Sequence, residues 1–214
     1  MLNMNTDNKL LLLYGGTFDP VHFGHLLPSI KLAEQVHAIS LTFIPCYLPP
    51  HKSPAKVTCE HRLAMLKLAL QQVQRSTDVQ LGASDFEIQQ EGHSFTRLTV
   101  EHFHSKLDAK ESLGFVIGMD SLLSFTTWFK WKEVLDYCDI YVMQRPGYPL
   151  ELSKLDGEIR DLLGTKIHLI ETDEVNISST EIRQSLVRGL DKAINQLPES
   201  VYDYIKQHGM YSGS

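Results

Sequence analysis

The sequence lacks any apolar stretch long enough to cross a membrane, and it has no excess of basic residues. The apolar run Leu10–Tyr14 is too short for a signal peptide, and Asp7 interrupts the basic start that such a peptide needs. Lysine and arginine number 20 against 26 acidic residues, which gives a formal net charge of −6. A mildly acidic chain has no broad electrostatic surface for DNA or RNA, so we expect neither a membrane nor a nucleic acid as partner.

Cysteine is also scarce. Cys46, Cys59 and Cys138 show no CxxC spacing, and an odd number of cysteines cannot pair completely. Free thiols are typical of a reducing compartment, so we expect a cytoplasmic protein. The sequence leaves open whether the chain is a monomer or a homo-oligomer.

With 214 residues, 43% of them hydrophobic, the chain is expected to form a single domain over 1–214. Its core is expected over 9–188, followed by a C-terminal helix over 198–208. Continuous apolar runs predict strands buried on both faces at Lys9–Tyr14, Ser40–Ile44, Gly114–Ile117, Ile140–Met143 and Lys166–Ile170. Helical spacing predicts helices at Gly24–Val36, Cys59–Val73, Ser94–Ser105, Ser179–Val187 and Glu199–Gln207. This alternation predicts an α/β fold with a doubly wound, mostly parallel sheet.

Two segments lack clear periodicity. Pro45–Thr58 holds four prolines and is predicted to be a long loop that leaves the carboxyl end of the second strand, where ligands bind in open α/β sheets. Thr58 is a candidate cap for the helix that follows. Gly147–Gly164 is charged and weakly periodic, and we expect it to be peripheral.

The most informative segment reads GGTFDPVHFGH, from Gly15 to His25, between the first strand and the first helix. Paired glycines at a strand end allow a tight turn and close approach of a ligand to the backbone. The helix start that follows presents unpaired N–H groups and a partial positive charge, which suit a phosphate. His22 and His25 are three residues apart and project to the same side of the first turn. We therefore predict a phosphate site here.

Other interpretations of this segment must be weighed. It fits neither the dinucleotide fingerprint G-x-G-x-x-G nor the P-loop pattern. The two histidines can also be zinc ligands, but no third or fourth ligand lies nearby in the sequence. Histidine pairs at this spacing are often ordinary surface or core residues.

A second segment, NISSTEIR over Asn176–Arg183, points to the same chemistry. Serine and threonine would begin a helix here and offer N–H and hydroxyl groups to an anion, and Arg183 lies one turn further on. Taken alone, this pattern more often belongs to a capped amphipathic helix whose arginine is solvated.

The two segments resemble the G-G-T-F-D-P-V-H-x-G-H and I-S-x-T-x-I-R signatures of the nucleotidyltransferase superfamily. Further segments along nearly the whole chain resemble the bacterial nicotinate-nucleotide adenylyltransferase family: PPHK at 49–52, SFT at 94–96, GMDS at 118–121, WF at 128–129 and RPG at 145–147. The resemblance implies transfer of the adenylyl group of ATP to nicotinate mononucleotide, which gives nicotinate adenine dinucleotide and pyrophosphate in NAD biosynthesis. The chain departs from the family at Cys46 and Tyr47, where an asparagine pair is common.

The resemblance also implies site residues. On the ATP side these are Gly15, Gly16, Thr17, Phe18, His22, His25, Asp120, Ile177, Ser178, Thr180 and Arg183. On the mononucleotide side they are Lys52, Thr96, Trp128, Phe129 and Arg145. The expected catalytic residues are His22, His25, Lys52 and Arg183. Trp128 or Phe129 is expected to stack on the pyridine ring, and Thr96 to receive the ring substituent.

The implied mechanism is an in-line attack by an already ionised phosphate oxygen on the α-phosphorus of ATP, so no protein base is needed. Mg²⁺ is expected on the phosphates, without a dedicated protein site. Three rivals remain: a superfamily member that acts on phosphopantetheine, a nucleotide sensor without chemistry, and a redox or flavin domain.

Overall fold

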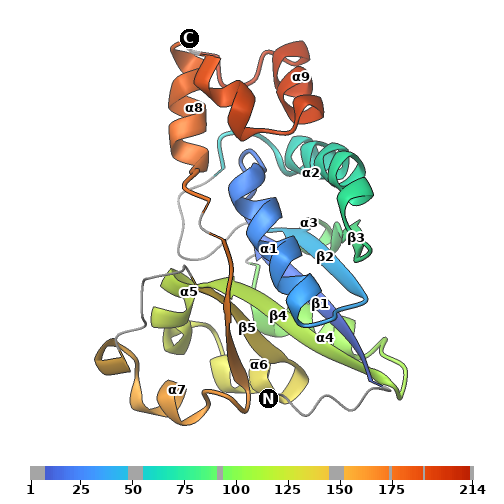
Figure 1. Ribbon diagram of the computed structural model, residues 1–214, viewed down its shortest axis with the longest axis vertical. Coiled ribbons are helices and arrows are strands. Elements are labelled where there is room, and N and C mark those ends of the chain that lie inside the picture. The colour runs from blue at the N-terminus through green and yellow to red at the C-terminus, as the bar shows by residue number, and fades with distance from the viewer. Residues whose placement is uncertain are drawn as a thin grey trace.

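The structure is a computed structural model that describes residues 8–47, 55–90, 94–144, 152–173, 175–189 and 191–212. Within these ranges the chain forms a parallel sheet of six strands in the order β3-β2-β1-β4-β5-β6 (Figure 1). The strands are β1 Lys9–Gly16, β2 Ser40–Pro45, β3 Gln80–Ala83, β4 Glu111–Gly118, β5 Asp139–Gln144 and β6 Ile167–Glu171. From β1 the strands are added toward one edge as β2 and β3, and from β4 toward the other edge as β5 and β6. The strand order therefore reverses between β1 and β4, which are hydrogen-bonded neighbours at the centre of the sheet.

The five predicted strands are confirmed, each within a few residues of its expected bounds. β3 was not predicted. Its four residues, QLGA, contain a glycine and no continuous apolar run. It lies at the edge of the sheet and pairs in parallel with β2, from Ser40 opposite Gln80 to Phe43 opposite Ala83. The pairing with β2, rather than the local sequence, is what makes this segment a strand.

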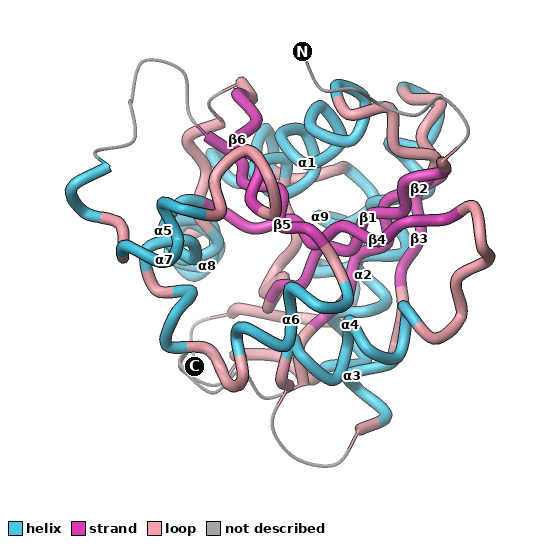
Figure 2. The backbone as a smooth tube through the Cα atoms, turned by 90° about the horizontal axis from the view of Figure 1, so that it is seen from below, coloured by secondary structure: helices cyan, strands magenta, loops and turns pink. Residues whose placement is uncertain are grey.

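Helices cover both faces of the sheet, as Figure 2 shows for α1 on one side and for α4 and α6 on the other. Leu12 and Leu13 are successive residues of β1, and they belong to different hydrophobic cores because neighbouring side chains of a strand point to opposite faces. The first core includes residues of α1, α2, α8 and α9. The second includes residues of α4 and α6. Two packed layers therefore fix the sheet between them.

The predicted helices are confirmed as α1 Phe23–Gln35, α2 Cys59–Val73, α4 Thr96–His104, α8 Ser179–Val187 and α9 Glu199–Gln207. Short elements that carry too few turns for a periodic signal were not predicted. These are α3 Phe86–Gln89, α5 Met119–Leu123, α6 Trp131–Tyr137, α7 Gly157–Asp161 and the 3₁₀ turns Gln74–Ser76, Phe125–Thr127, Leu152–Lys154 and Asp191–Gln196. Thr58 is the N-cap residue of α2, but its hydroxyl makes no capping hydrogen bond.

The segment expected to be peripheral is described from residue 152 onward, and this part contributes to the core. Leu155 and Ile159 are 5% and 1% exposed and pack in the second core. In the described part of this segment these are the two buried apolar side chains, and two such residues among many charged ones give no clear periodic pattern in the sequence. The predicted loop Pro45–Thr58 is described only up to residue 47 and from residue 55. Among the described helices, none combines the length and the apolar character needed to span a bilayer.

Gly114 of β4 lies between side chains of the two neighbouring strands, β1 and β5. A Cβ atom added there would lie 2.6 Å from Leu12 Cδ2 and 2.6 Å from Tyr141 Cε2. We predict that Gly114→Ala lowers the free energy of unfolding by about 1–3 kcal/mol, because overpacking forces neighbouring side chains from their rotamers. Urea denaturation measures this change. Gly157→Ala is the matched control, since its Cβ would meet only Arg160 Nη2 at 3.9 Å; equal midpoints for the two variants would contradict the prediction.

Candidate active site

A cavity of about 970 Å³ opens at the carboxyl ends of β1 and β4, where the strand order reverses. Ligands of open α/β sheets bind at such a switch point. The predicted site residues that line the cavity are Gly15, Gly16, Thr17, Phe18, His25, Thr96, Asp120, Trp128, Phe129, Thr180 and Arg183. His22, Ile177 and Ser178 do not line it. Lys52 and Arg145 lie outside the described residues. Segments far apart in the sequence thus meet around one cavity.

The turn after β1 requires glycine at two positions. A Cβ atom on Gly16 would lie 2.7 Å from the ring of Phe18, whose φ of 48° closes the turn. A Cβ atom on Gly24 would lie 2.9 Å from His22 Nδ1 and 3.0 Å from the carbonyl oxygen of Ile177. Gly24 therefore lets the segment before α8 approach the first turn of α1. This contact explains physically why a glycine separates the two histidines.

The two histidines stack on each other, with ring centroids 3.7 Å apart and planes inclined by 30°. His25 faces the cavity, whereas His22 lies behind it and is only 3% exposed. Burial lowers the pKa of His22 to about 4, so its ring is neutral near pH 7. Its Nδ1 atom has no hydrogen-bond partner within the described part of the chain. The described residues contain no group of three metal-ligating side chains, so nothing there completes a zinc site.

Arg183 brings positive charge to the cavity from the first turns of α8. Its Nη1 donates to the backbone oxygen of Asp19 at 2.6 Å, and its Nη2 donates to Thr180 Oγ1 at 3.1 Å. Ser178 caps α8 by accepting a hydrogen bond from the N–H of Glu181 at 3.2 Å. These contacts aim the guanidinium and the start of α8 at the turn Gly15–Asp19, which suits an anion held between them.

Arg62 is a residue of this region that the sequence analysis did not single out. Its side chain is 1% exposed, and its guanidinium donates to the backbone oxygens of Thr17 and Cys46, both at 2.7 Å. It therefore ties α2 to the turn after β1 and to the end of β2. The signal in the sequence was an arginine between Cys59 and Met65 on the apolar face of α2, where a charge is costly unless it has a task.

Aromatic side chains form the opposite wall of the cavity. Phe95 and Phe129 have ring centroids 4.6 Å apart, and Phe129 is 48% exposed. Trp128 packs edge-on against Phe125 and Phe115, with centroids 5.2 and 6.4 Å away. The backbone N–H of Tyr47 donates to Ser94 Oγ at 2.9 Å, which ties the loop after β2 to the start of α4. The wall suits a flat ring.

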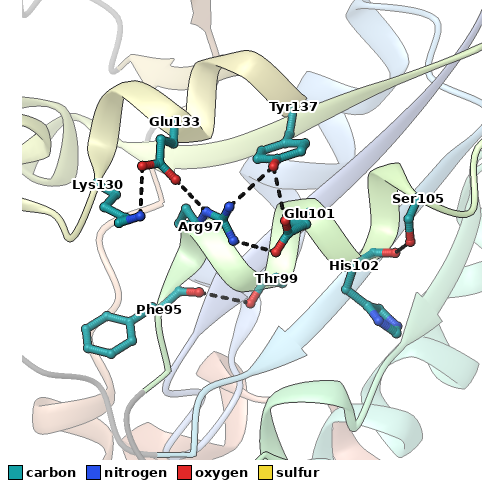
Figure 3. Close-up of polar contacts among 9 residues, drawn as sticks. All are labelled: Phe95, Arg97, Thr99, Glu101, His102, Ser105, Lys130, Glu133 and Tyr137. Carbon is teal, nitrogen blue, oxygen red and sulfur yellow. Dashed lines mark hydrogen bonds and ion pairs between the residues drawn. The ribbon is translucent and has the colours of Figure 1, made fainter.

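Arg97 clamps together the two helices that carry this wall (Figure 3). From α4 it forms ion pairs with Glu101 and, at 2.8 Å, with Glu133 of α6, and it donates to the hydroxyl of Tyr137 at 3.3 Å. Lys130 pairs with the same Glu133 at 2.9 Å. Thr96 begins α4 and Phe129 precedes α6, so this network fixes the distance between them.

The turn Gly15–Asp19 and the arginine-bearing helix α8 meet at the switch point of a parallel sheet. This strand order and this site are those of a nucleotidyltransferase. The family model described as cytidylyltransferase-like matches residues 13–185. A protein of Klebsiella pneumoniae named probable nicotinate-nucleotide adenylyltransferase is 35% identical over 95% of this chain and 97% of its own length. A protein of the same name from Marinomonas sp. is 35% identical over 94% of each chain. The chain belongs to the cytidylyltransferase-like family and, within it, to the nicotinate-nucleotide adenylyltransferases.

Solved structures share the fold. A nicotinic acid mononucleotide adenylyltransferase of Plasmodium falciparum, in complex with APC, superposes with a TM-score of 0.73 at 18% identity, covering 95% of this chain and 98% of its own. The same enzyme in complex with NaAD gives a TM-score of 0.70 at 17% identity, with coverage of 95% and 98%. At these identities the likeness shows the architecture, which agrees with the predicted fold class.

The lowered pKa of His22 predicts a pH dependence of stability. Between pH 6.5 and about 4 the unfolded chain protonates this histidine and the folded chain does not. The stabilisation by His22 is therefore present above pH 6.5 and is lost as the pH falls toward 4, up to about 3 kcal/mol. We expect His22→Asn, which cannot protonate, to lose less stability than the wild type over this range, as measured by urea unfolding at each pH.

His37→Asn is the matched control, because His37 is exposed and asparagine tolerates its φ of 52°. A wild type and a His22→Asn variant whose unfolding free energies change in parallel from pH 6.5 to 4 would refute the prediction.

Proposed function

We propose that the chain transfers the adenylyl group of ATP to nicotinate mononucleotide, forming nicotinate adenine dinucleotide and pyrophosphate in NAD biosynthesis. The observation that carries the proposal is that one cavity combines two unlike walls. One wall has the turn Gly15–Asp19, His25 and Arg183, which suit a triphosphate, and the other has Thr96, Phe95 and Phe129, which suit a flat ring. The names of the relatives support the same reaction.

The reaction joins two anions. An oxygen of the mononucleotide 5′-phosphate forms a bond to the α-phosphorus of ATP, while the bond from that phosphorus to the bridging oxygen of pyrophosphate breaks. The attacking oxygen is already ionised at neutral pH, so no protein group has to remove a proton. Catalysis consists of positioning the two phosphates in line and stabilising the charge on the phosphoryl oxygens. Because burial lowers the pKa of His22 to about 4, this ring is uncharged near neutral pH, so in this scheme it adds no positive charge.

On the ATP side we assign His25 and Arg183 to the phosphate oxygens, with the Gly15–Gly16 backbone and Thr17 along their path. Thr17 Oγ1 is buried and has no partner within the described residues, so it is available to a phosphate. His22 supports His25 from behind by stacking. Ile177, Ser178 and Thr180 place the positive end of α8 near the triphosphate. Lys52 is proposed to add a second cation and, with Arg145, to hold the mononucleotide phosphate.

On the mononucleotide side, we assign Thr96 to the substituent of the pyridine ring and Phe129 or Trp128 to its face. Asp120, expected on the ATP side, is exposed on the rim of the cavity and is proposed to accept a hydrogen bond from a ribose hydroxyl of ATP. Tyr47 replaces an amide that is common in the family, and its exposed hydroxyl is proposed to take over that contact.

Mg²⁺ is proposed to arrive on the phosphates and to neutralise part of their charge. The site fits such an ion: Asp120 offers an exposed carboxylate oxygen at the cavity, whereas the described residues form no cage of three or more ligands.

We place the protein in the cytoplasm, which is supported by three cysteines that form no disulfide.

The test of the proposed function is pyrophosphate release from ATP and Mg²⁺ with nicotinate mononucleotide, nicotinamide mononucleotide or phosphopantetheine as acceptor. We expect the highest kcat/KM with the nicotinate form. Release only with phosphopantetheine would keep the class of enzyme and overturn its substrate. ATP binding without release for any acceptor would favour a nucleotide sensor instead.

His25→Ala is predicted to lower kcat by about 100-fold or more, the usual cost of removing one positioned group from a charge-stabilising site. The ring of His25 lines the cavity and its main packing partners are His22 and Phe18, so the melting temperature should change little. Steady-state kinetics and thermal unfolding of the same preparation separate the two effects. A normal kcat for this variant would remove His25 from the mechanism.

A further inference from the structure

The C-terminal segment contacts the turn Gly15–Asp19 through Tyr211. Its hydroxyl donates to Asp19 Oδ1 at 2.6 Å, although 192 positions separate the two residues in the sequence. Burial and the bond to Asp19 raise the pKa of Tyr211, so the hydroxyl keeps the proton that it donates. Gly209 and Tyr211 both have positive φ, 60° and 53°, and these turns bring the chain back from α9 toward the site.

Asp19 is 5% exposed, and both of its carboxylate oxygens have donors. Tyr211 contacts Oδ1, and the backbone N–H of Lys56 donates to Oδ2 at 2.7 Å. Arg183 Nη1 lies 3.9 Å from Oδ2, which is beyond hydrogen-bond distance, and it donates instead to the backbone oxygen of Asp19. The Arg183 guanidinium is thus held beside the carboxylate without a direct hydrogen bond to it.

A buried carboxylate oxygen that loses its hydrogen-bond donor is destabilised until another donor replaces it. Arginine is a suitable donor because it pairs with carboxylates through two parallel hydrogen bonds. Here the available guanidinium belongs to Arg183, which lines the cavity. If Asp19 turned toward it, the carboxylate would neutralise and reorient the cation that the triphosphate needs. The hydroxyl of Tyr211 prevents this by occupying Oδ1.

We propose that Tyr211 is a positioning residue for ATP: its hydroxyl holds the Asp19 carboxylate so that Arg183 stays directed at the triphosphate. The inference rests on the proposed function, since it assigns Arg183 to ATP. It adds a role for the C-terminal segment, which is far from both signatures in the sequence and, up to residue 212 where its description ends, does not line the cavity.

The test compares Tyr211→Phe with Tyr204→Phe. The first substitution keeps the packing of the ring against the first core and removes only the bond to Asp19. The second removes a hydroxyl that contacts His61 Nδ1 at 3.0 Å, between α2 and α9. We expect Tyr211→Phe to weaken MgATP binding, measured by calorimetry, and to raise the KM for ATP, both about 10-fold, with the acceptor KM within about 2-fold. Tyr204→Phe should bind MgATP like the wild type.

A third variant tests the route through Arg183. In an Arg183→Met background, Tyr211→Phe should cause no further loss of MgATP affinity, because the cation that Asp19 would capture is gone. The inference is overturned if Tyr211→Phe binds MgATP like Tyr204→Phe, if it raises both KM values equally with a fall in melting temperature, or if its effect persists without Arg183. A wild type that binds MgATP but releases no pyrophosphate would contradict the proposed function alone, since the binding comparison would still decide the role of Tyr211.

Discussion

The turn between β1 and α1 depends on hydrogen bonds from distant segments, and the site depends on this turn. Its backbone oxygens and the Asp19 carboxylate cannot be satisfied within a turn so short. Arg62 supplies the donors at Thr17, and Arg183, Lys56 and Tyr211 supply them at Asp19. Because buried polar groups are costly without partners, α2, α8 and the C-terminal segment must dock for the turn to persist. Assembly of the fold and assembly of this turn are therefore one event.

The charge of the molecule is arranged around the same turn. A chain with a net charge of −6 repels a triphosphate at long range, so the attraction must be local. Arg183 lines the cavity, and Arg62 lies buried beneath it with carbonyl oxygens as its partners. A buried guanidinium that contacts carbonyl oxygens keeps its full positive charge, whereas a carboxylate partner would cancel it. Backbone oxygens thus hold Arg62 in place without cancelling its positive charge.

Elements that depend on residues close together in the sequence could be predicted, whereas elements and contacts that depend on residues far apart in the sequence could not. The buried strands and the long helices carry their pattern locally, and α2, α8 and α9 have the bounds that the spacing predicts. β3 depends on its pairing with β2, and α6 depends on its packing against α4. Segments of four and seven residues carry too little periodic signal of their own. The segment Gly15–His25 was singled out because its glycines and its histidines lie close together in the sequence. The partners of Asp19 were not, because nothing in the sequence links residue 19 to residue 211.

The histidine pair shows the same limit on a smaller scale. The sequence treats His22 and His25 as equivalent, since both lie on one side of a helix turn. The structure separates them, because His22 is the N-cap residue and lies beneath the helix start, whereas His25 is one turn further on and faces the cavity. Gly24 leaves room at this place, because a Cβ atom there would lie 2.9 Å from His22 Nδ1 and 3.0 Å from the carbonyl oxygen of Ile177. Burial thus keeps His22 neutral, whereas His25 remains in contact with the cavity.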